Sequence, residues 1–95
     1  MTRFANPEEE TLEKSSTQTD DAQDSKLILH NDEFNTFDHV IESIKVICEL
    51  DQHQAEQIAM LAHYRGKATV RKGERAYLES MSAKLADQEI TTEVV

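Results

Sequence analysis

Apolar residues recur with helical spacing in three stretches after residue 36. The first stretch has an apolar stripe at i, i+3, i+4, i+7, i+10 and i+11, formed by Phe37, Val40, Ile41, Ile44, Ile47 and Cys48. This spacing is typical of a helix that buries one face. Asn35 or Thr36 can cap the helix, because either side chain can accept a hydrogen bond from the first free backbone amides.

Two further helices are predicted in the same way. Asp51 and Gln54 have the spacing of a capping box and mark the start of the second helix. Gly66 stands where a left-handed residue commonly ends a helix. Only Asp51 separates the first two helices, which predicts a tight helical hairpin. The inner face of the second helix is expected to contain Ala55, Ile58, Ala59, Leu61 and Ala62, and that of the third Tyr77, Leu78, Met81 and Leu85.

Three short segments have the composition of strands. Lys26–His30 is a brief apolar run, Lys67–Arg71 alternates apolar and polar residues, and Ile90–Val95 is rich in β-branched side chains. The order of elements is therefore β-α-α-β-α-β. We predict an α+β fold, a single small domain with a three-stranded sheet and the helices packed on one face.

Before this domain, residues 1–25 carry few large apolar side chains. Arg3 and Lys14 are opposed there by seven acids, Glu8, Glu9, Glu10, Glu13, Asp20, Asp21 and Asp24. Such a segment cannot bury enough apolar area to offset the entropy of ordering it. We therefore predict a flexible acidic N-terminal extension at 1–25 and a core domain at 26–95.

The charge and the cysteine content narrow the classes of function. A net charge of −9 disfavours proteins that bind nucleic acid or an anionic membrane, since both must attract phosphate groups. Cys48 is the only cysteine, so an intrachain disulfide cannot form. No apolar run reaches membrane-spanning length, and the N-terminus lacks the layout of a signal peptide. We expect a cytoplasmic protein that is monomeric on its own.

The sequence offers little for catalysis or metal binding. His30, His39, His53 and His63 lack zinc-type spacing. Cys48 lies on the apolar stripe, where a free cysteine packs as a small hydrophobic residue. No nucleophile–base pair or glycine-rich phosphate loop is present, so we expect no enzyme, no metal and no cofactor. A basic run is either solvated surface or a docking patch for an acidic partner: Arg65, Lys67, Arg71, Lys72 and Arg75.

The polar junction after the first predicted strand has two interpretations. Asn31, Asp32 and Glu33 stand where one tight turn would serve. They can satisfy turn amides and cap the next helix, which is the usual role of Asn and Asp. Alternatively, an amide oxygen beside carboxylates can hold a protonated amine through charge-assisted hydrogen bonds. His63 on the second helix can then complete the site from the opposite wall.

From about Lys26 to Val95 the chain resembles the ClpS family, adaptors that bring N-end-rule substrates to a Clp AAA+ unfoldase. The resemblance rests on "LILHNDEFNTFDHVI" and "AEQIAMLAHYRGKA" in this order. It implies an adaptor that holds the free α-amino group of an N-degron with Asn31, Asp32 and His63 and docks on the N-terminal domain of a ClpA- or ClpC-type unfoldase. The first side chain (Leu, Phe, Tyr or Trp in the family) would enter a pocket lined by Leu29, Glu33, Asn35, Phe37, Val40, Ala59 and Ala62 and closed by Thr92 or Val94.

Two departures from the family pattern bear on specificity. Ala59 stands where a bulky Met is usual, and Phe37 replaces a frequent Met. The missing Met side chain predicts a roomier pocket that also admits Ile or Val as the first residue. The same order of elements occurs in the C-terminal domain of the ribosomal stalk protein. A protein–protein interaction domain without an amine pocket is therefore the alternative function.

Overall fold

The computed structural model describes residues 25–95, which form six elements in the predicted order. The elements are β1 (Ser25–His30), α2 (Phe37–Ile47), α3 (Gln52–Arg65), β2 (Lys67–Gly73), α4 (Arg75–Asp87) and β3 (Thr92–Val94). The predicted element order and α+β class are confirmed. The predicted N-terminal extension lies outside the described residues except for Ser25, which is buried and begins β1 one residue earlier than expected.

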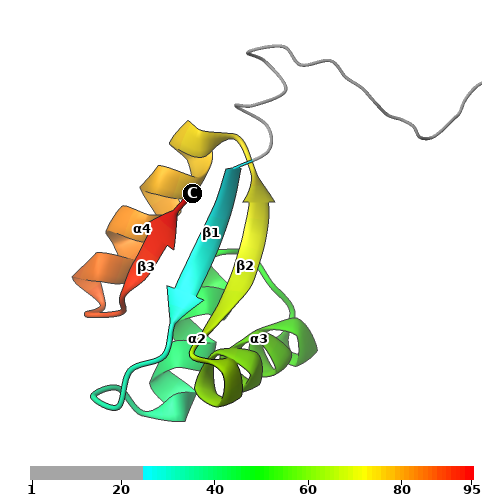
Figure 1. Ribbon diagram of the computed structural model, residues 1–95, viewed down its shortest axis with the longest axis vertical. Helices are drawn as coiled ribbons and strands as arrows, with labels where there is room; N and C mark the ends of the chain where they lie inside the picture. Colours follow the sequence, from blue (N-terminus) through cyan, green and yellow to red (C-terminus); the bar gives the residue numbers. More distant parts are fainter. Residues whose placement is uncertain (1–24) are drawn as a thin grey trace, which may run out of the picture.

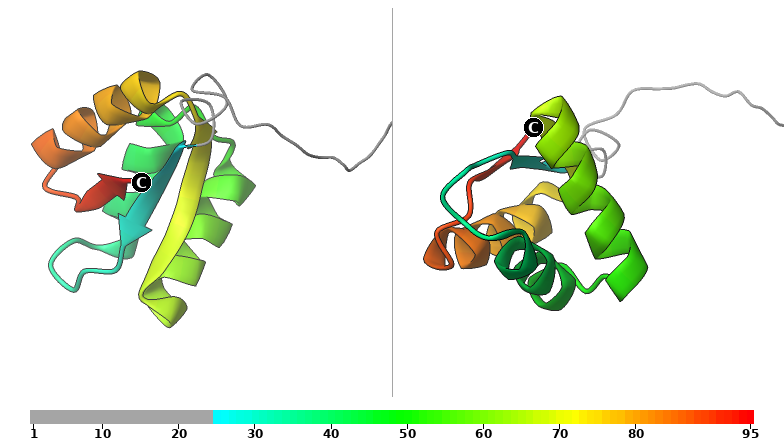
Figure 2. Two further views of the ribbon diagram at one scale, coloured as in Figure 1. Left: turned by 45° about the horizontal axis from the view of Figure 1, so that its top comes forward. Right: turned by 90° about the horizontal axis from the view of Figure 1, so that it is seen from below.

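The central strand of the sheet is β1, which pairs antiparallel with both neighbours in the order β2-β1-β3. Leu27 lies opposite Val94 on β3, and Leu29 lies opposite Ala68 on β2. The three helices lie on one face of the sheet (Figure 1 and Figure 2). Within residues 25–95 no element covers the other face, so the fold has two layers with one core between them.

The core forms where the inner face of the sheet meets the helices. Along β1, Leu27 and Leu29 are buried whereas Lys26 is exposed, which is the period-two alternation of a half-buried strand. Burying one large apolar side chain stabilises a fold by about 1.5–3 kcal/mol. The largest fully buried side chains among the described residues are Leu27, Leu29, Ile44, Cys48, Leu78, Leu85 and Ile90. This core fixes β1 and therefore the loop that follows it.

Capping residues and a left-handed glycine determine where the helices near that loop begin and end. Thr36 is the residue that caps α2, with its hydroxyl accepting from a backbone amide of the first turn. Asp51 forms the predicted capping box with Gln54 at the start of α3. Gly66 ends α3 with a φ of +92°, a left-handed conformation that favours glycine. Its carbonyl accepts a hydrogen bond of 2.9 Å from the Asn31 amide, which ties the end of α3 to the residue after β1.

Two predictions about inner faces are wrong. Leu61 and Tyr77 are 42% and 43% exposed. Each is adjacent in sequence to a buried residue, Ala62 or Leu78, and one residue turns a helix by about 100°. Apolar character alone therefore placed both side chains on the wrong side of the stripe.

The limits of some elements also differ from the prediction. The connection between α2 and α3 is longer than one residue, spans 48–51 and includes Glu49 in a left-handed conformation with a φ of 59°. Strand β2 continues to Gly73, and β3 begins at Thr92. Ile90 precedes β3 and is buried in the core instead of pairing in the sheet.

Candidate functional site

The site is built on the loop between β1 and α2, which Asp32 organises. Its Oδ1 accepts hydrogen bonds from the backbone amides of Phe34 at 3.1 Å and Asn35 at 2.8 Å. Its Oδ2 accepts from Nδ2 of Asn35 at 3.1 Å. The same Nδ2 donates to the carbonyl of Glu89 at 2.8 Å, between α4 and β3. This is the turn-forming role expected of Asp, and it fixes the loop to the rest of the domain.

The pKa of Asp32 reflects these contacts. Burial raises the pKa of the carboxyl, but the hydrogen bonds from Asn35 and Phe34 and the nearby His39 together lower it below its ordinary value. Hydrogen bonds to the charged form favour that form. Asp32 is therefore an anion at neutral pH whose two oxygens are already engaged within the loop.

A pocket of about 300 Å³ opens between this loop, α2 and α3. Small-molecule pockets span about 300–1,000 Å³, so a cavity at the lower limit suits one amino-acid side chain. Leu29, Ala59 and Ala62 are buried and form its deep apolar part. The complete lining is Leu29, His30, Asn31, Asp32, Glu33, Asn35, Phe37, Val40, Ala59, Ala62 and His63.

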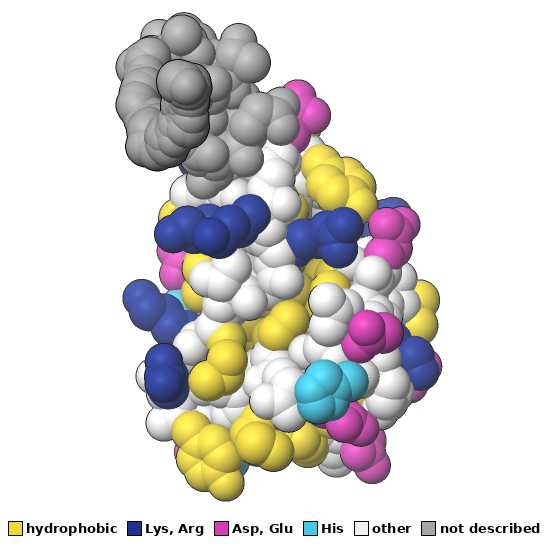
Figure 3. Space-filling model, turned by 90° about the vertical axis from the view of Figure 1, so that its right-hand side faces the viewer, with side chains coloured by type: hydrophobic (Ala, Val, Ile, Leu, Met, Phe, Trp, Pro, Cys, Tyr) yellow, Lys and Arg dark blue, Asp and Glu magenta, His cyan; other side chains and the backbone are white. Residues whose placement is uncertain are grey.

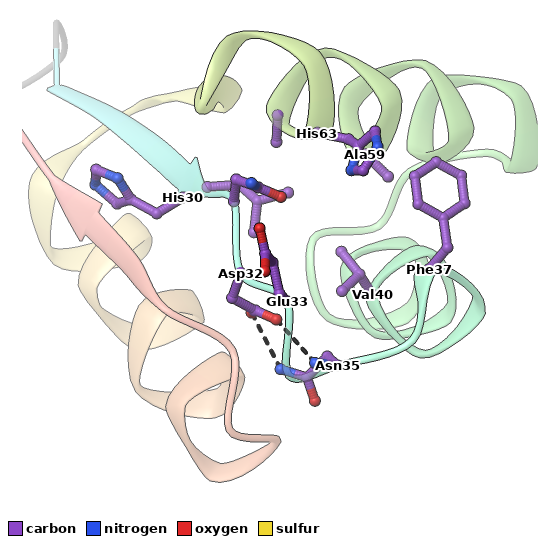
Figure 4. A pocket seen from close by; sticks show the side chains of 11 residues that line it. His30, Asp32, Glu33, Asn35, Phe37, Val40, Ala59 and His63 are labelled. Atoms are coloured by element: carbon purple, nitrogen blue, oxygen red, sulfur yellow. Dashed lines mark hydrogen bonds between the residues drawn. The ribbon is translucent and has the colours of Figure 1, made fainter.

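Polar groups surround the mouth of the pocket (Figure 4). Asn31 and Glu33 come from the loop, and His63 comes from the last turn of α3. Figure 4 shows the Glu33 side chain running along the inner side of the loop, whereas Asp32 turns toward Asn35. Within residues 25–95 the Glu33 carboxylate accepts no hydrogen bond. The Glu33 carboxylate is thus free of hydrogen-bond contacts within these residues, whereas Asp32 Oδ2 accepts one hydrogen bond and keeps a further lone pair.

Aromatic contacts position His63 at the edge of the pocket. Its ring meets the ring of Phe37 edge to face, with centroids 6.3 Å apart and planes at 79°. It meets the ring of Tyr64 in the same manner, at 5.3 Å and 68°. Phe37 is 43% exposed and thus forms an outer wall of the pocket. Edge-to-face pairs of this kind favour a defined ring orientation.

The pocket brings together every site residue predicted from the sequence except Val94. Val94 lies opposite Leu27 near the start of β1, whereas the pocket lies at the other end of that strand, at Leu29, His30 and the loop that follows. Thr92 also lies outside the lining and hydrogen-bonds to Ser82. The prediction that the last strand closes the pocket is therefore wrong, because it ignored the register of β1 and β3. The binding roles of the other residues stay predictions.

His30 lines the pocket but was not predicted from the sequence. It is the last residue of β1 and directly precedes the polar loop, which is the signal that could have drawn attention to it. Its ring Nε2 contacts the carboxylate of Glu93 on β3. Figure 4 shows the His30 ring lying toward β3, where it contacts Glu93 and links the two strands.

Other kinds of site have little support in the part of the chain that the structure describes. No group of three His, Cys, Asp or Glu in residues 25–95 could hold a metal ion. Cys48 is buried, and burial is the main reason why the pKa of its thiol is raised to about 11. A thiol of that pKa is almost entirely protonated at neutral pH and is a poor nucleophile. None of the helices within 25–95 is long and apolar enough to span a membrane.

Together, the fold and the pocket define a small α+β domain with an apolar pocket that has polar groups at its mouth. Residues 20–93 match the family model described as "ATP-dependent Clp protease adaptor protein ClpS". The chain therefore belongs to the ClpS family. This match favours the ClpS family over the alternative fold relative, the ribosomal stalk domain that shares the order of elements.

Two curated relatives and one solved structure illustrate the likeness. The ClpS adapter proteins of Vibrio atlanticus and Vibrio cholerae are 34% and 32% identical over 65 residues. Each match covers 68% of this chain and 61% of the relative's length. The structure of Agrobacterium tumefaciens ClpS2 bound to L-phenylalaninamide superposes with a TM-score of 0.73 over 78% of this chain and 96% of that one. At 21% sequence identity this likeness shows a common fold.

Proposed function

We propose that this chain is an adaptor that binds the free α-amino group and the bulky hydrophobic first residue of N-degron substrates. It delivers them to the N-terminal domain of a ClpA- or ClpC-type AAA+ unfoldase. The observation that carries the proposal is the pocket between the β1–α2 loop, α2 and α3, with an apolar interior and with Asn31, Glu33 and His63 at its mouth. Membership of the ClpS family supports it. So does the ligand of the Agrobacterium relative, an amino-acid amide whose α-amino group is free.

The mouth of the pocket suits a protonated amine. An α-ammonium group has three donors, and Asn31 Oδ1, the Glu33 carboxylate and a neutral ring nitrogen of His63 can each accept one. The carboxylate supplies the charge that makes such a hydrogen bond short and strong. Asp32, which the resemblance to ClpS makes an amine ligand, acts in this arrangement as a positioning residue, because its oxygens hold the loop that carries Asn31 and Glu33. An acetylated terminus would leave the Glu33 charge without its partner and would bind weakly.

The apolar interior selects the first side chain by size and shape. Leu29 forms the deep wall, and α3 contributes only the methyl groups of Ala59 and Ala62. Two small residues one turn apart on the same helix leave room near the Cβ position of a bound residue. A β-branched side chain carries its extra carbon at Cβ, so Ile and Val are accepted along with Leu, Phe, Tyr and Trp.

A fluorescence-anisotropy titration of matched peptides tests the proposal. The peptides begin with Leu, Phe, Ile or Ala, and an acetylated Leu peptide is the control. Binding of Leu and Phe that is lost on acetylation supports an amine-and-pocket adaptor. Ile binding more than tenfold weaker than Leu, a difference of about 1.4 kcal/mol, would reject only the widened specificity. Equal, flat curves for all five peptides would reject the adaptor function itself.

A further inference from the structure

The open face of the sheet carries a one-sided distribution of charge. Strands β1 and β2 contain Lys26, Lys67, Arg71 and Lys72 and no acidic residue, although the whole chain has 19 acids against 10 bases. Figure 3 shows Lys and Arg side chains along the left of the view, with others near its centre and right margin, and most of the visible Asp and Glu on the right. Lys67 and Lys72, two of the basic residues that the sequence marks as surface or docking patch, thus lie on the same strand as part of this face.

The lysines of this face lack acidic partners among the described residues. Lys26 lies directly opposite Lys72 in the pairing of β1 with β2, and both side chains are exposed. Like charges at directly opposed positions of antiparallel strands are destabilising. Lys67, at the other end of β2, is also exposed, and none of the three forms an ion pair within residues 25–95. The part of the open face formed by β1 and β2 therefore presents positive charge without an ion-pair partner, while Glu93 on β3, opposite Ile28, is engaged by His30.

Arg71 and Arg75, which belong to the same basic run of the sequence, interact with other groups of the domain and are not part of this surface. Arg71 donates from Nη1 to the carbonyl of Cys48 at 3.0 Å and closes the end of α2. Arg75 pairs with Glu79 one turn along α4, at 3.4 Å. Arg65 is exposed at the end of α3 and borders a shallow groove with Lys67, Ile28 and Thr69. The docking surface is accordingly defined by Lys26, Arg65, Lys67 and Lys72, with Ile28 and Thr69 between them.

We propose that this surface binds the acidic N-terminal segment of the same chain, residues 8–24. Seven carboxylates in that segment face only one base, Lys14, so its charge is opposite to that of the surface. The segment joins the domain at Ser25, next to Lys26. Attachment at that point gives the segment a high effective concentration at the surface, of the order of millimolar for short connections. This contact is independent of the pocket and of the function proposed for it.

The lengths involved allow the contact. From Lys72 to Lys67 the face extends about 17 Å, at about 3.3 Å per residue. Asp20, Asp21 and Asp24 lie within five residues of Ser25 and can reach back to Lys26 and Lys72. Glu13 is twelve residues from Ser25 and can span about 40 Å when extended. This reach extends beyond Lys67 to Arg65, so the acids are distributed along the length of the docking surface.

A spin label on the segment tests this proposal in the full chain. The label is placed at Thr17→Cys, since the native Cys48 is buried. At low salt we expect the label to weaken the amide NMR signals of Lys67, Thr69 and Lys72 most strongly. The effect should be lost at high salt, where screening acts within about 3 Å at 1 M. It should also be lost in Lys67→Gln/Lys72→Gln, and it should persist in the matched control Lys45→Gln/Lys84→Gln, which removes two charges elsewhere.

Each alternative result is informative. Equal weakening of signals on both faces of the domain would overturn the proposal, because the segment would then have no preferred surface. Weakening over the sheet that survives in Lys67→Gln/Lys72→Gln would overturn the electrostatic basis. Mixing labelled chains with an excess of unlabelled, isotope-enriched chains separates the sources. If those enriched chains show the effect, the segment binds a second copy and not its own domain, which also overturns the proposal.

Discussion

The neighbouring carboxylates Asp32 and Glu33 should differ sharply in what they contribute, and substitution of each one tests this. Glu33→Gln keeps the size of the side chain and removes its charge. Hydrogen bonds to charged groups contribute about 1.5–3 kcal/mol. Glu33 is exposed, which favours the lower limit of this range of free energy. A difference of about 1.4 kcal/mol corresponds to a factor of ten in the dissociation constant. We expect roughly tenfold weaker binding of a Leu-initiated peptide and an unchanged melting temperature.

Asp32→Ala should mainly lower the stability of the fold and affect peptide binding only indirectly. It removes the acceptor for the backbone amides of Phe34 and Asn35 and for the Asn35 side chain. Leaving such groups without a partner costs about 1–3 kcal/mol, reduced here because water reaches the loop. We expect a lower free energy of unfolding, with weaker peptide binding as a consequence of a less ordered loop.

Anisotropy titrations and urea unfolding of the two variants and the wild type give both quantities. The acetylated Leu peptide provides the baseline for binding that does not use the amine. One pattern would refute the reasoning. If Glu33→Gln binds like the wild type while Asp32→Ala loses binding at unchanged stability, Asp32 itself holds the amine and the assignment of roles is wrong.

Three further predictions concern the pocket, the caps and pH. Ala59→Met should fill part of the pocket of about 300 Å³ and weaken the binding of Ile-initiated peptides more than that of Leu-initiated ones, as measured by anisotropy. An equal loss of affinity for both peptides would contradict the idea that Ala59 makes room for β-branched side chains. Asp51→Ala should lower the free energy of unfolding by about 1 kcal/mol in urea titrations through loss of the capping box, and no change would mean that the cap is dispensable. The pKa of the Asp32 carboxyl is lower in the folded than in the unfolded state. The ionised carboxylate therefore stabilises the fold at pH values above its unfolded pKa of about 3.9, and this stabilisation is lost as the pH falls through the folded pKa. The stability difference between wild type and Asp32→Ala should therefore shrink at acid pH, and a constant difference would show that the charge is irrelevant.

The sequence was informative where one residue determines local geometry. The capping box at Asp51 and the left-handed Gly66 follow from side-chain chemistry alone, and the structure confirms both. The apolar stripe of α2 is buried or partly buried from Val40 to Cys48, whereas Phe37, Leu61 and Tyr77 are exposed, because apolar character alone does not decide which side chains point inward. Such choices are made by packing against other elements, which the local pattern does not contain.

The candidate site was likewise only partly predictable from the sequence. The loop and the helix that form the pocket were recognisable because their polar residues interrupt apolar patterns. The sequence does not indicate which of the two carboxylates folds back on the loop amides. The structure shows that Asp32 does, and which of them holds an amine stays a prediction. Val94 was misassigned because strand register is a property of pairing between residues far apart in the chain. His30 was overlooked because nothing in the sequence shows that a strand end borders a cavity.

The central position of β1 has a consequence for how the protein folds. Both of its partners come much later in the chain, with Leu29 pairing with Ala68 and Leu27 with Val94. The contacts of α2 with α3 are local, so this helical hairpin can form early, whereas the sheet requires closure of long loops. Asn31 reaches its place only when β1 has docked and its amide meets the carbonyl of Gly66. We expect the mouth of the pocket to be completed late in folding, after its helical walls have formed.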